Sequence, residues 1–143
     1  MFNGTLGLGR YFGIPVRAHW SMALVAVLFG VSFADSLGVV AGLIAVVAFF
    51  TSILAHEFGH ALVARRYGVQ TQSIDLWALG GVARLDSEPP TPRADGYIAG
   101  AGPLVSLVIG AATVGAWMAL GSRVLFLIGA VNIMLAVFNM LPG

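Results

Sequence analysis

The chain has 143 residues, of which 59% are apolar and only 9% are charged, and its formal net charge is +1. Soluble domains carry about 25% charged residues, so this composition predicts a protein of the lipid bilayer. The basic residues are seven scattered arginines, which are too few for a nucleic-acid-binding face, and the absence of cysteine excludes disulfides and thiolate metal sites.

The first residues do not resemble a cleavable signal peptide. An extended segment, Gly13 to Arg17, precedes the first apolar run, and no small-residue cleavage site follows it. A spanning helix needs about 20 mainly apolar residues. Four segments meet or approach this length: residues 18–34, 37–67, 96–120 and 124–143. We expect all four to stay in the protein and to cross the membrane.

The arginines predict how these spans are oriented. Arg10 and Arg17 precede the first span, and four further arginines lie between residues 65 and 93, two crossings later. Only Arg123 falls on the opposite side. Because cytoplasmic loops are enriched in Lys and Arg, we expect the N-terminus and the loop of residues 68–95 to be cytoplasmic.

The loop of residues 69–85 has the pattern of a small β-hairpin. Polar and apolar residues alternate from Ser73 to Trp77, and Gly80-Gly81 precedes a second short run that ends at Leu85. Two interpretations stay open: a surface hairpin resting on the lipid headgroups, or a sheet edge that accepts an extended substrate strand. After it, residues 87–92 are expected to break regular structure.

The third predicted span begins with many small residues. Gly96 and Gly100 have a spacing that lets helix backbones approach closely, and Pro103 is expected to loosen the helix. The sequence thus predicts an all-α membrane protein of about four transmembrane helices with a small membrane-associated β-hairpin or sheet. We expect residues 1–143 to form one domain, without internal repeats.

The sequence His56-Glu57-Phe58-Gly59-His60 carries the strongest chemical signal. Two histidines four residues apart lie on one face of a helix, so their imidazoles can bind a single zinc ion, Zn2+. Glu57 can take a proton from a zinc-bound water. A chance match is the alternative, but ionisable groups within a membrane helix are costly and by default mark function.

Catalytic zinc takes three protein ligands, and the sequence offers no good third one. His19 is expected to be an interfacial polar group. Four acidic residues are expected in the loops: Asp75, Asp86, Glu88 and Asp95. We therefore expect residues 1–143 to be a protease core that stops before its third zinc ligand.

At this point the sequence resembles the site-2 protease family of zinc intramembrane proteases, in its prokaryotic form. The resemblance covers nearly the whole chain, and the order and spacing of its motifs are specific. It rests on the segment Gly13 to Arg17 with His19-Trp20, on His56 to His60, on Leu79 to Leu85, on Ala101-Gly102-Pro103 and on Asn139 to Pro142.

The resemblance implies roles for individual residues. His56 and His60 bind zinc, Glu57 is the general base, and Asn139 holds the substrate carbonyl or the oxyanion. An interhelical hydrogen bond is the alternative role of Asn139. In the family, an Asp four residues beyond this chain's last residue is the third ligand.

The implied activity is endoproteolysis within transmembrane segments of substrate proteins, as a step of regulated intramembrane proteolysis. The implied partners are a transmembrane substrate and the lipid bilayer, without nucleic acid; the sequence does not predict an oligomeric state. Two alternatives compete with the enzyme. One is a non-catalytic membrane protein with a structural metal or polar packing site, and the other is a transporter, which predicts repeated halves that this sequence lacks.

Overall fold

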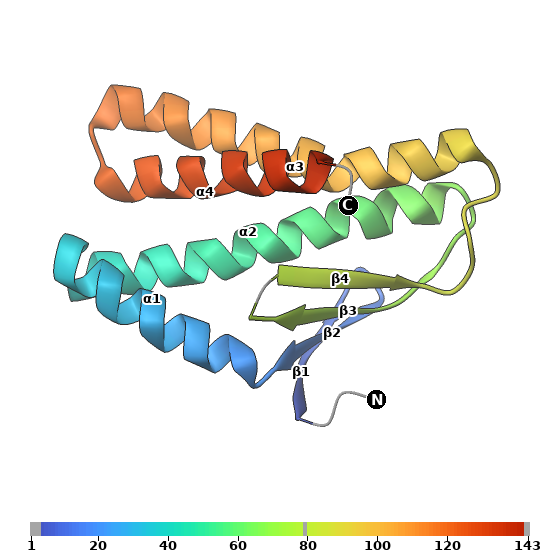
Figure 1. The fold of residues 1–143 in the computed structure, drawn as a ribbon, viewed down its shortest axis with the longest axis horizontal. Coiled ribbons are helices and arrows are strands. Elements are labelled where there is room, and N and C mark those ends of the chain that lie inside the picture. The colour runs from blue at the N-terminus through green and yellow to red at the C-terminus, as the bar shows by residue number, and fades with distance from the viewer. Residues whose placement is uncertain (1–3, 79, 142–143) are drawn as a thin grey trace.

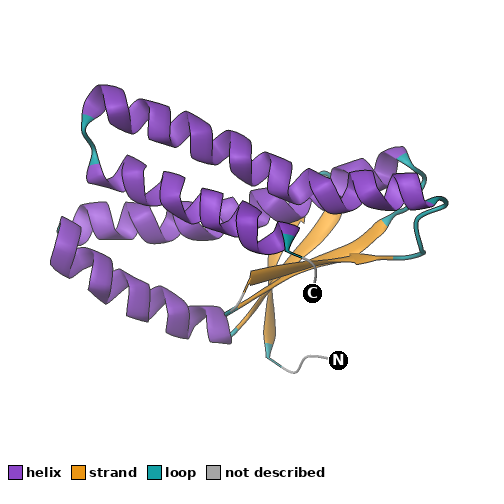
Figure 2. Cartoon of the chain, turned by 45° about the horizontal axis from the view of Figure 1, so that its top comes forward, coloured by secondary structure: helices purple, strands orange, loops and turns teal. Residues whose placement is uncertain are grey.

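The structure is a computed structural model that describes residues 4–78 and 80–141. Four helices lie side by side, and a small sheet packs against one side of them (Figures 1 and 2). The elements follow in the order β1 (Thr5–Tyr11), β2 (Ile14–His19), α1 (Ser21–Leu37), α2 (Val39–Arg66), β3 (Thr71–Trp77), β4 (Gly80–Leu85), α3 (Pro92–Leu120) and α4 (Arg123–Met140). The prediction of a mainly helical protein with a small sheet is confirmed.

Among the described residues, three helices are long and apolar enough to cross a membrane, namely α2, α3 and α4. The helix α1 is equally apolar but has only 17 residues. It begins at Ser21, three residues later than predicted, because Ala18 and His19 belong to strand β2. Three of the four predicted spans thus have the length and hydropathy needed to cross a membrane, and the predicted count of about four is not confirmed.

Helix α3 begins at Pro92, four residues before the predicted start at Gly96. The hydroxyl of Thr91 accepts a hydrogen bond from the amide of Ala94 over 3.1 Å, and Pro92 occupies the first helical turn, where its missing N–H costs nothing. The proline that was expected to break regular structure therefore begins the helix. The helix then continues through Pro103.

The sheet has four strands in the order β1-β2-β3-β4. The predicted hairpin is confirmed as the antiparallel pair β3–β4, in which Ile74 lies opposite Ala83. Strand β2 joins it in parallel, with Val16 opposite Ile74, and β1 pairs antiparallel with β2. The two N-terminal strands were not predicted, because the glycine-rich β1 carries little strand signal and the β2–β3 pairing joins residues far apart in sequence.

The inner face of the sheet packs on the middle of α2. The sheet contributes four side chains to a buried apolar cluster, namely Ile14, Val16, Ile74 and Leu76. Ile53 and Ala61 of α2 complete the cluster. Burial of aliphatic side chains contributes roughly 1.5–3 kcal/mol each. This core holds β4 beside the histidines of α2.

The outer face of the sheet carries an ionic cluster. Asp75 was expected in a loop but lies within β3. Asp95, also expected in a loop, lies in the first turn of α3. The carboxylate of Asp75 accepts hydrogen bonds from Arg17 on β2, over 2.7 and 2.9 Å, and from Arg84 on β4, over 2.5 Å. Burial alone would raise the pKa of Asp75, but the hydrogen bonds and charges of the two guanidinium groups outweigh it and hold that pKa below its usual range.

Helices α2 and α3 approach each other closely at Gly59. A Cβ atom at Gly59 would lie 2.8 Å from the carbonyl oxygen of Ala101, whereas a Cβ at Gly96 or Gly100 would meet no atom within 4 Å. The prediction that Gly96 and Gly100 bring helices together is therefore wrong for the described packing. The small residues that do so are Gly59 and Ala101.

A second pair of polar residues is buried between α2 and α4. The side-chain amide of Asn132 donates to the hydroxyl of Ser52 over 2.9 Å, and Asn132 is fully buried. Interhelical hydrogen bonds of this kind contribute about 0.6–2 kcal/mol in membranes. The pair joins α4 to α2 one helical turn before His56.

Candidate metal centre

The two motif histidines converge on one point. Their spacing on α2 brings the Nε2 atoms of His56 and His60 to 3.2 Å from each other. Two nitrogen ligands at about 2.0–2.1 Å on a tetrahedral zinc ion lie roughly 3.3 Å apart. The distance between the two nitrogens therefore fits a shared metal ion.

The other ring nitrogens are held by α3. Nδ1 of His60 lies 2.7 Å from the carbonyl oxygen of Ile98. Because a carbonyl only accepts, this Nδ1 carries the proton, and Nε2 of the neutral ring keeps its lone pair for a metal. Nδ1 of His56 lies 2.8 Å from the hydroxyl of Ser106, which is fully buried. Both contacts are of the kind that orients metal-binding histidines.

Gly102 of α3 leaves the space in front of both imidazoles open. A Cβ atom at this position would lie 2.7 Å from Nε2 of His56 and still closer to Nε2 of His60. The missing side chain thus creates a cradle at the point where the two lone pairs meet. A zinc ion fits this cradle and this donor set.

Glu57 reaches the sheet. Its Oε2 accepts a hydrogen bond from the backbone amide of Ala83 on β4, over 3.0 Å. A Cβ at Gly81 would lie 2.5 Å from Cγ of Glu57, so only glycine lets β4 approach this closely. Glu57 is 7% exposed and His56 is 1% exposed, which leaves both side chains nearly shielded from solvent.

A catalytic zinc site needs a third protein ligand. Within residues 4–78 and 80–141, no group of three His, Cys, Asp or Glu side chains is placed to hold a metal ion. His19, expected to be an interfacial polar group, lies in β2 with Nδ1 2.8 Å from the hydroxyl of Ser21. Asp75 is engaged by two arginines. The described residues therefore bring together two histidines whose Nε2 atoms could bind one metal ion and a carboxylate beside them.

Asn139 lies at the exposed end of α4. Its side-chain amide donates to the carbonyl of Leu135 in the same helix, over 2.7 Å. In the described part of the chain no hydrogen bond joins it to the histidines or to Glu57, so its role stays a prediction. Leu79 and Pro142, which belong to motifs of the resemblance, lie outside the described residues.

Three residues of the site escaped prediction: Ser106, Gly102 and Ala83. Gly102 was named only within the motif Ala101-Gly102-Pro103, without a role at the site. Ser106 is one hydroxyl within an apolar segment, and Ala83 contributes a backbone amide, for which a sequence carries no signal. The buried hydroxyl in a membrane helix is the one feature that could have marked Ser106.

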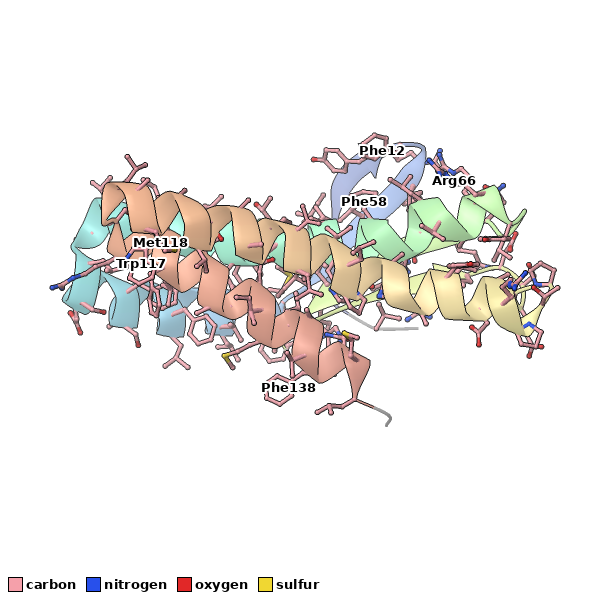
Figure 3. The ribbon with its side chains drawn as sticks, turned by 90° about the horizontal axis from the view of Figure 1, so that it is seen from above. Phe12, Phe58, Arg66, Trp117, Met118 and Phe138 are labelled. Carbon is pink, nitrogen blue, oxygen red and sulfur yellow. The ribbon has the colours of Figure 1, made fainter. Side chains whose placement is uncertain are left out.

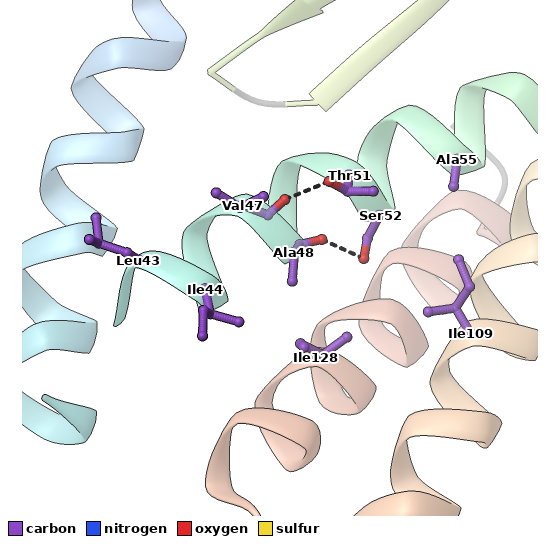
Figure 4. A pocket seen from close by; sticks show the side chains of 9 residues that line it. All are labelled: Leu43, Ile44, Val47, Ala48, Thr51, Ser52, Ala55, Ile109 and Ile128. Carbon is purple, nitrogen blue, oxygen red and sulfur yellow. Dashed lines mark hydrogen bonds between the residues drawn. The ribbon is translucent and has the colours of Figure 1, made fainter. Parts of the chain in front are cut away.

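An apolar groove of about 510 Å³ lies beside the site (Figure 4). Its wall on α2 runs from Leu43 to Ala55, and Ile109 of α3 and Ile128 of α4 face it. The two hydroxyl groups on this wall are already bonded, since Thr51 donates to Val47 and Ser52 to Ala48. The groove thus presents apolar surface that ends one residue before His56.

Known proteins match this chain in sequence and fold. The model of peptidase family M50 matches residues 44–123. Rip3 of Mycobacterium tuberculosis is 41% identical over 97% of this chain and 40% of its own length. A zinc metalloprotease of Methanocaldococcus jannaschii is 32% identical over 99% of this chain and 42% of its own length.

The fold agrees with these matches. A solved structure of a site-2 protease from Methanocaldococcus jannaschii matches with a TM-score of 0.80 and 30% identity, over 97% of this chain and 65% of that one. The chain spans about 40% of the length of the curated relatives. The resemblance to site-2 proteases is confirmed, and the chain belongs to peptidase family M50.

Proposed function

We propose that residues 1–143 form the core of a zinc endopeptidase that cleaves peptide bonds within transmembrane segments of other proteins. The convergence of the His56 and His60 Nε2 atoms on the cradle at Gly102 carries this proposal. It is supported by the relatives whose names describe a zinc metalloprotease and a site-2 protease.

The residues of the chain have separate tasks in this proposal. His56 and His60 hold zinc through Nε2, while Ser106 and the carbonyl of Ile98 fix the two rings. Bound zinc supplies a Lewis acid that brings the pKa of its water to about 7. Glu57 would accept a proton from the attacking water and pass it to the leaving amine. Asn139 binds the carbonyl oxygen of the substrate.

The free edge of β4 supports a binding mode for the substrate. Since β4 is the last strand of the sheet and Ala83 directs its amide toward Glu57, a strand added along β4 would place its carbonyl beside the general base. An unwound substrate segment can bind an edge strand through backbone hydrogen bonds. This favours the substrate-accepting interpretation of the hairpin over a purely structural one.

The apolar helices support a location of this chemistry within the membrane. The arginine distribution supports a cytoplasmic N-terminus and a cytoplasmic loop of residues 68–95. The groove on α2 offers apolar surface of the kind that a substrate helix could contact before it unwinds. The substrate helix and the active site would then lie at the same depth in the bilayer.

The test of this function is cleavage of a labelled transmembrane substrate in vesicles by the wild type and by Glu57→Gln. Loss of a general base costs about 10²–10⁴-fold in rate, and Glu57→Gln should keep its zinc. A structural metal site predicts that neither property changes. Equal cleavage by both proteins would contradict the proposed role of Glu57.

A further inference from the structure

The N-terminal hairpin, formed by β1 and β2, exposes apolar side chains that its own fold does not cover. Leu6 is 70% exposed, Leu8 46% and Trp20 56%. These three residues, which we call the hairpin base, lie on β1 and at the residue between β2 and α1. Strand β1 is outermost in the sheet, so its far edge has no partner strand among the described elements.

The hairpin base is continuous with the first apolar helix. Trp20 directly precedes α1, and its amide donates to the carbonyl of Gly4 over 3.1 Å, which ties the start of β1 to the start of the helix. With 17 residues, α1 is about 26 Å long at about 1.5 Å per residue, against about 30 Å of hydrocarbon. A short span draws its flanking residues toward the bilayer.

The turn of the hairpin packs against α2. The rings of Phe12 and Phe58 meet edge to face with centroids 5.4 Å apart (Figure 3). Arg65 donates to the carbonyl of Phe12 over 2.6 Å. The apolar base therefore belongs to a hairpin that is packed on α2 and joined to the start of α1.

Charge and aromatic content match a lipid surface. The first 34 residues contain no Asp or Glu and two arginines, Arg10 and Arg17. Arg17 is already paired with Asp75, so Arg10 is the charge that this argument uses. Tryptophan is enriched at the boundary between headgroups and acyl chains, and arginine is attracted to anionic headgroups. The unpaired backbone of β1 needs hydrogen-bonding partners, which exist among headgroups and water but not in hydrocarbon.

We propose that the hairpin base is an interfacial anchor, in which Leu6, Leu8 and Trp20 insert at the boundary between headgroups and acyl chains of an anionic bilayer. Arg10, further along β1, lies at the level of the phosphates. Because the four strands form one sheet, this contact also sets the depth of the free β4 edge in the membrane. The inference does not depend on the proposed protease activity.

Fluorescence quenching of single-tryptophan variants tests the anchor. The background carries Trp20→Phe, Trp77→Phe and Trp117→Phe, and the reporters are Leu6→Trp and, as a matched aqueous control in an exposed loop, Glu88→Trp. A third protein keeps Trp20 alone and leaves the hairpin base unchanged. Each is reconstituted in phosphatidylglycerol-containing vesicles with acyl chains brominated near the headgroup, or with iodide in the water.

The anchor predicts that Trp at position 6 and Trp20 are quenched several-fold more strongly by brominated lipid than by iodide, and that the Glu88→Trp reporter shows the reverse. If both hairpin reporters behave like the Glu88→Trp reporter, the anchor is overturned. It is equally overturned if they escape both quenchers and regain iodide quenching at one copy per vesicle, since a second copy of the chain would then cover β1.

Discussion

The backbone amide of Ala83 on β4 donates to Oε2 of Glu57 on α2 across 3.0 Å. The contact joins the free edge of the sheet to the carboxylate that neighbours His56. It makes the sheet part of the catalytic machinery in our account, because the strand that would bind substrate also positions the base.

The first prediction concerns this amide. Ala83→Pro removes the donor, while the partner strand β3 lies on the other edge of β4. We expect cleavage of a transmembrane substrate to fall about 10-fold or more, as one hydrogen bond to a charged group contributes about 1.5–3 kcal/mol, with zinc content unchanged. Ala83→Gly keeps the amide and serves as the control. Full activity of Ala83→Pro would show that the amide of Ala83 on β4 does not position Glu57 for catalysis.

A second prediction uses two glycines of the same helix. Gly102→Ala places a methyl group between the two histidines, so we expect zinc binding to be lost although the helix remains folded. Gly100→Ala meets no atom within 4 Å, so zinc binding should persist and the helix should gain about 0.5–1 kcal/mol. The measurement is the zinc content of both purified proteins. A normal zinc content in Gly102→Ala would show that the open space at Gly102 is not where zinc binds.

Ser106 provides the third prediction. Ser106→Ala leaves Nδ1 of His56 without its oriented partner, and loss of such contacts typically weakens metal binding 10–100-fold. Thr113→Ala is the matched control, because the hydroxyl of Thr113 bonds only carbonyls of its own helix, among the contacts described. Competition with a zinc chelator measures both affinities. Equal zinc affinities of Ser106→Ala and Thr113→Ala would show that the hydroxyl of Ser106 does not orient His56 for metal binding.

The fourth prediction concerns acid. Since the pKa of Asp75 is lowered in the folded protein, its ionised form stabilises the sheet above the ordinary carboxyl pKa of about 3.9. This stabilisation is lost as the pH falls through the lowered pKa. We expect the wild type to exceed Asp75→Asn in Tm at neutral pH and the difference to shrink below about pH 4. A difference independent of pH would contradict the ionic role.

Features that depend on neighbouring residues could be predicted from the sequence, whereas features that depend on segments far apart in the sequence could not. The paired imidazoles of His56 and His60 could be predicted, because four-residue spacing on a helix fixes their geometry. The β3–β4 hairpin could also be predicted, because its two strands are adjacent in the sequence. The parallel pairing of β2 with β3, and the position of Gly102 over the histidines, depend on how distant segments pack, and no periodicity encodes them.

Helix boundaries show the same division. Apolar length located all four helices to within about four residues. The start of α1 was misplaced by three residues because Ala18 and His19 belong to strand β2, and the start of α3 by four because the helix begins at Pro92. Tight packing was assigned to Gly96 and Gly100 from spacing alone, yet the contact forms at Gly59. Sequence spacing identifies small residues that permit two helices to approach closely. Which of them lie in the contact depends on where the partner helix packs.

The most direct test of the central claim is the zinc affinity of the purified chain, compared with His60→Ala and Glu57→Gln. Our account predicts that the wild type and Glu57→Gln bind zinc alike, and that His60→Ala loses it because one of the two converging nitrogens is gone. If His60→Ala bound zinc as tightly as the wild type, His56 and His60 would not share a metal ion, and the proposed active site would be wrong.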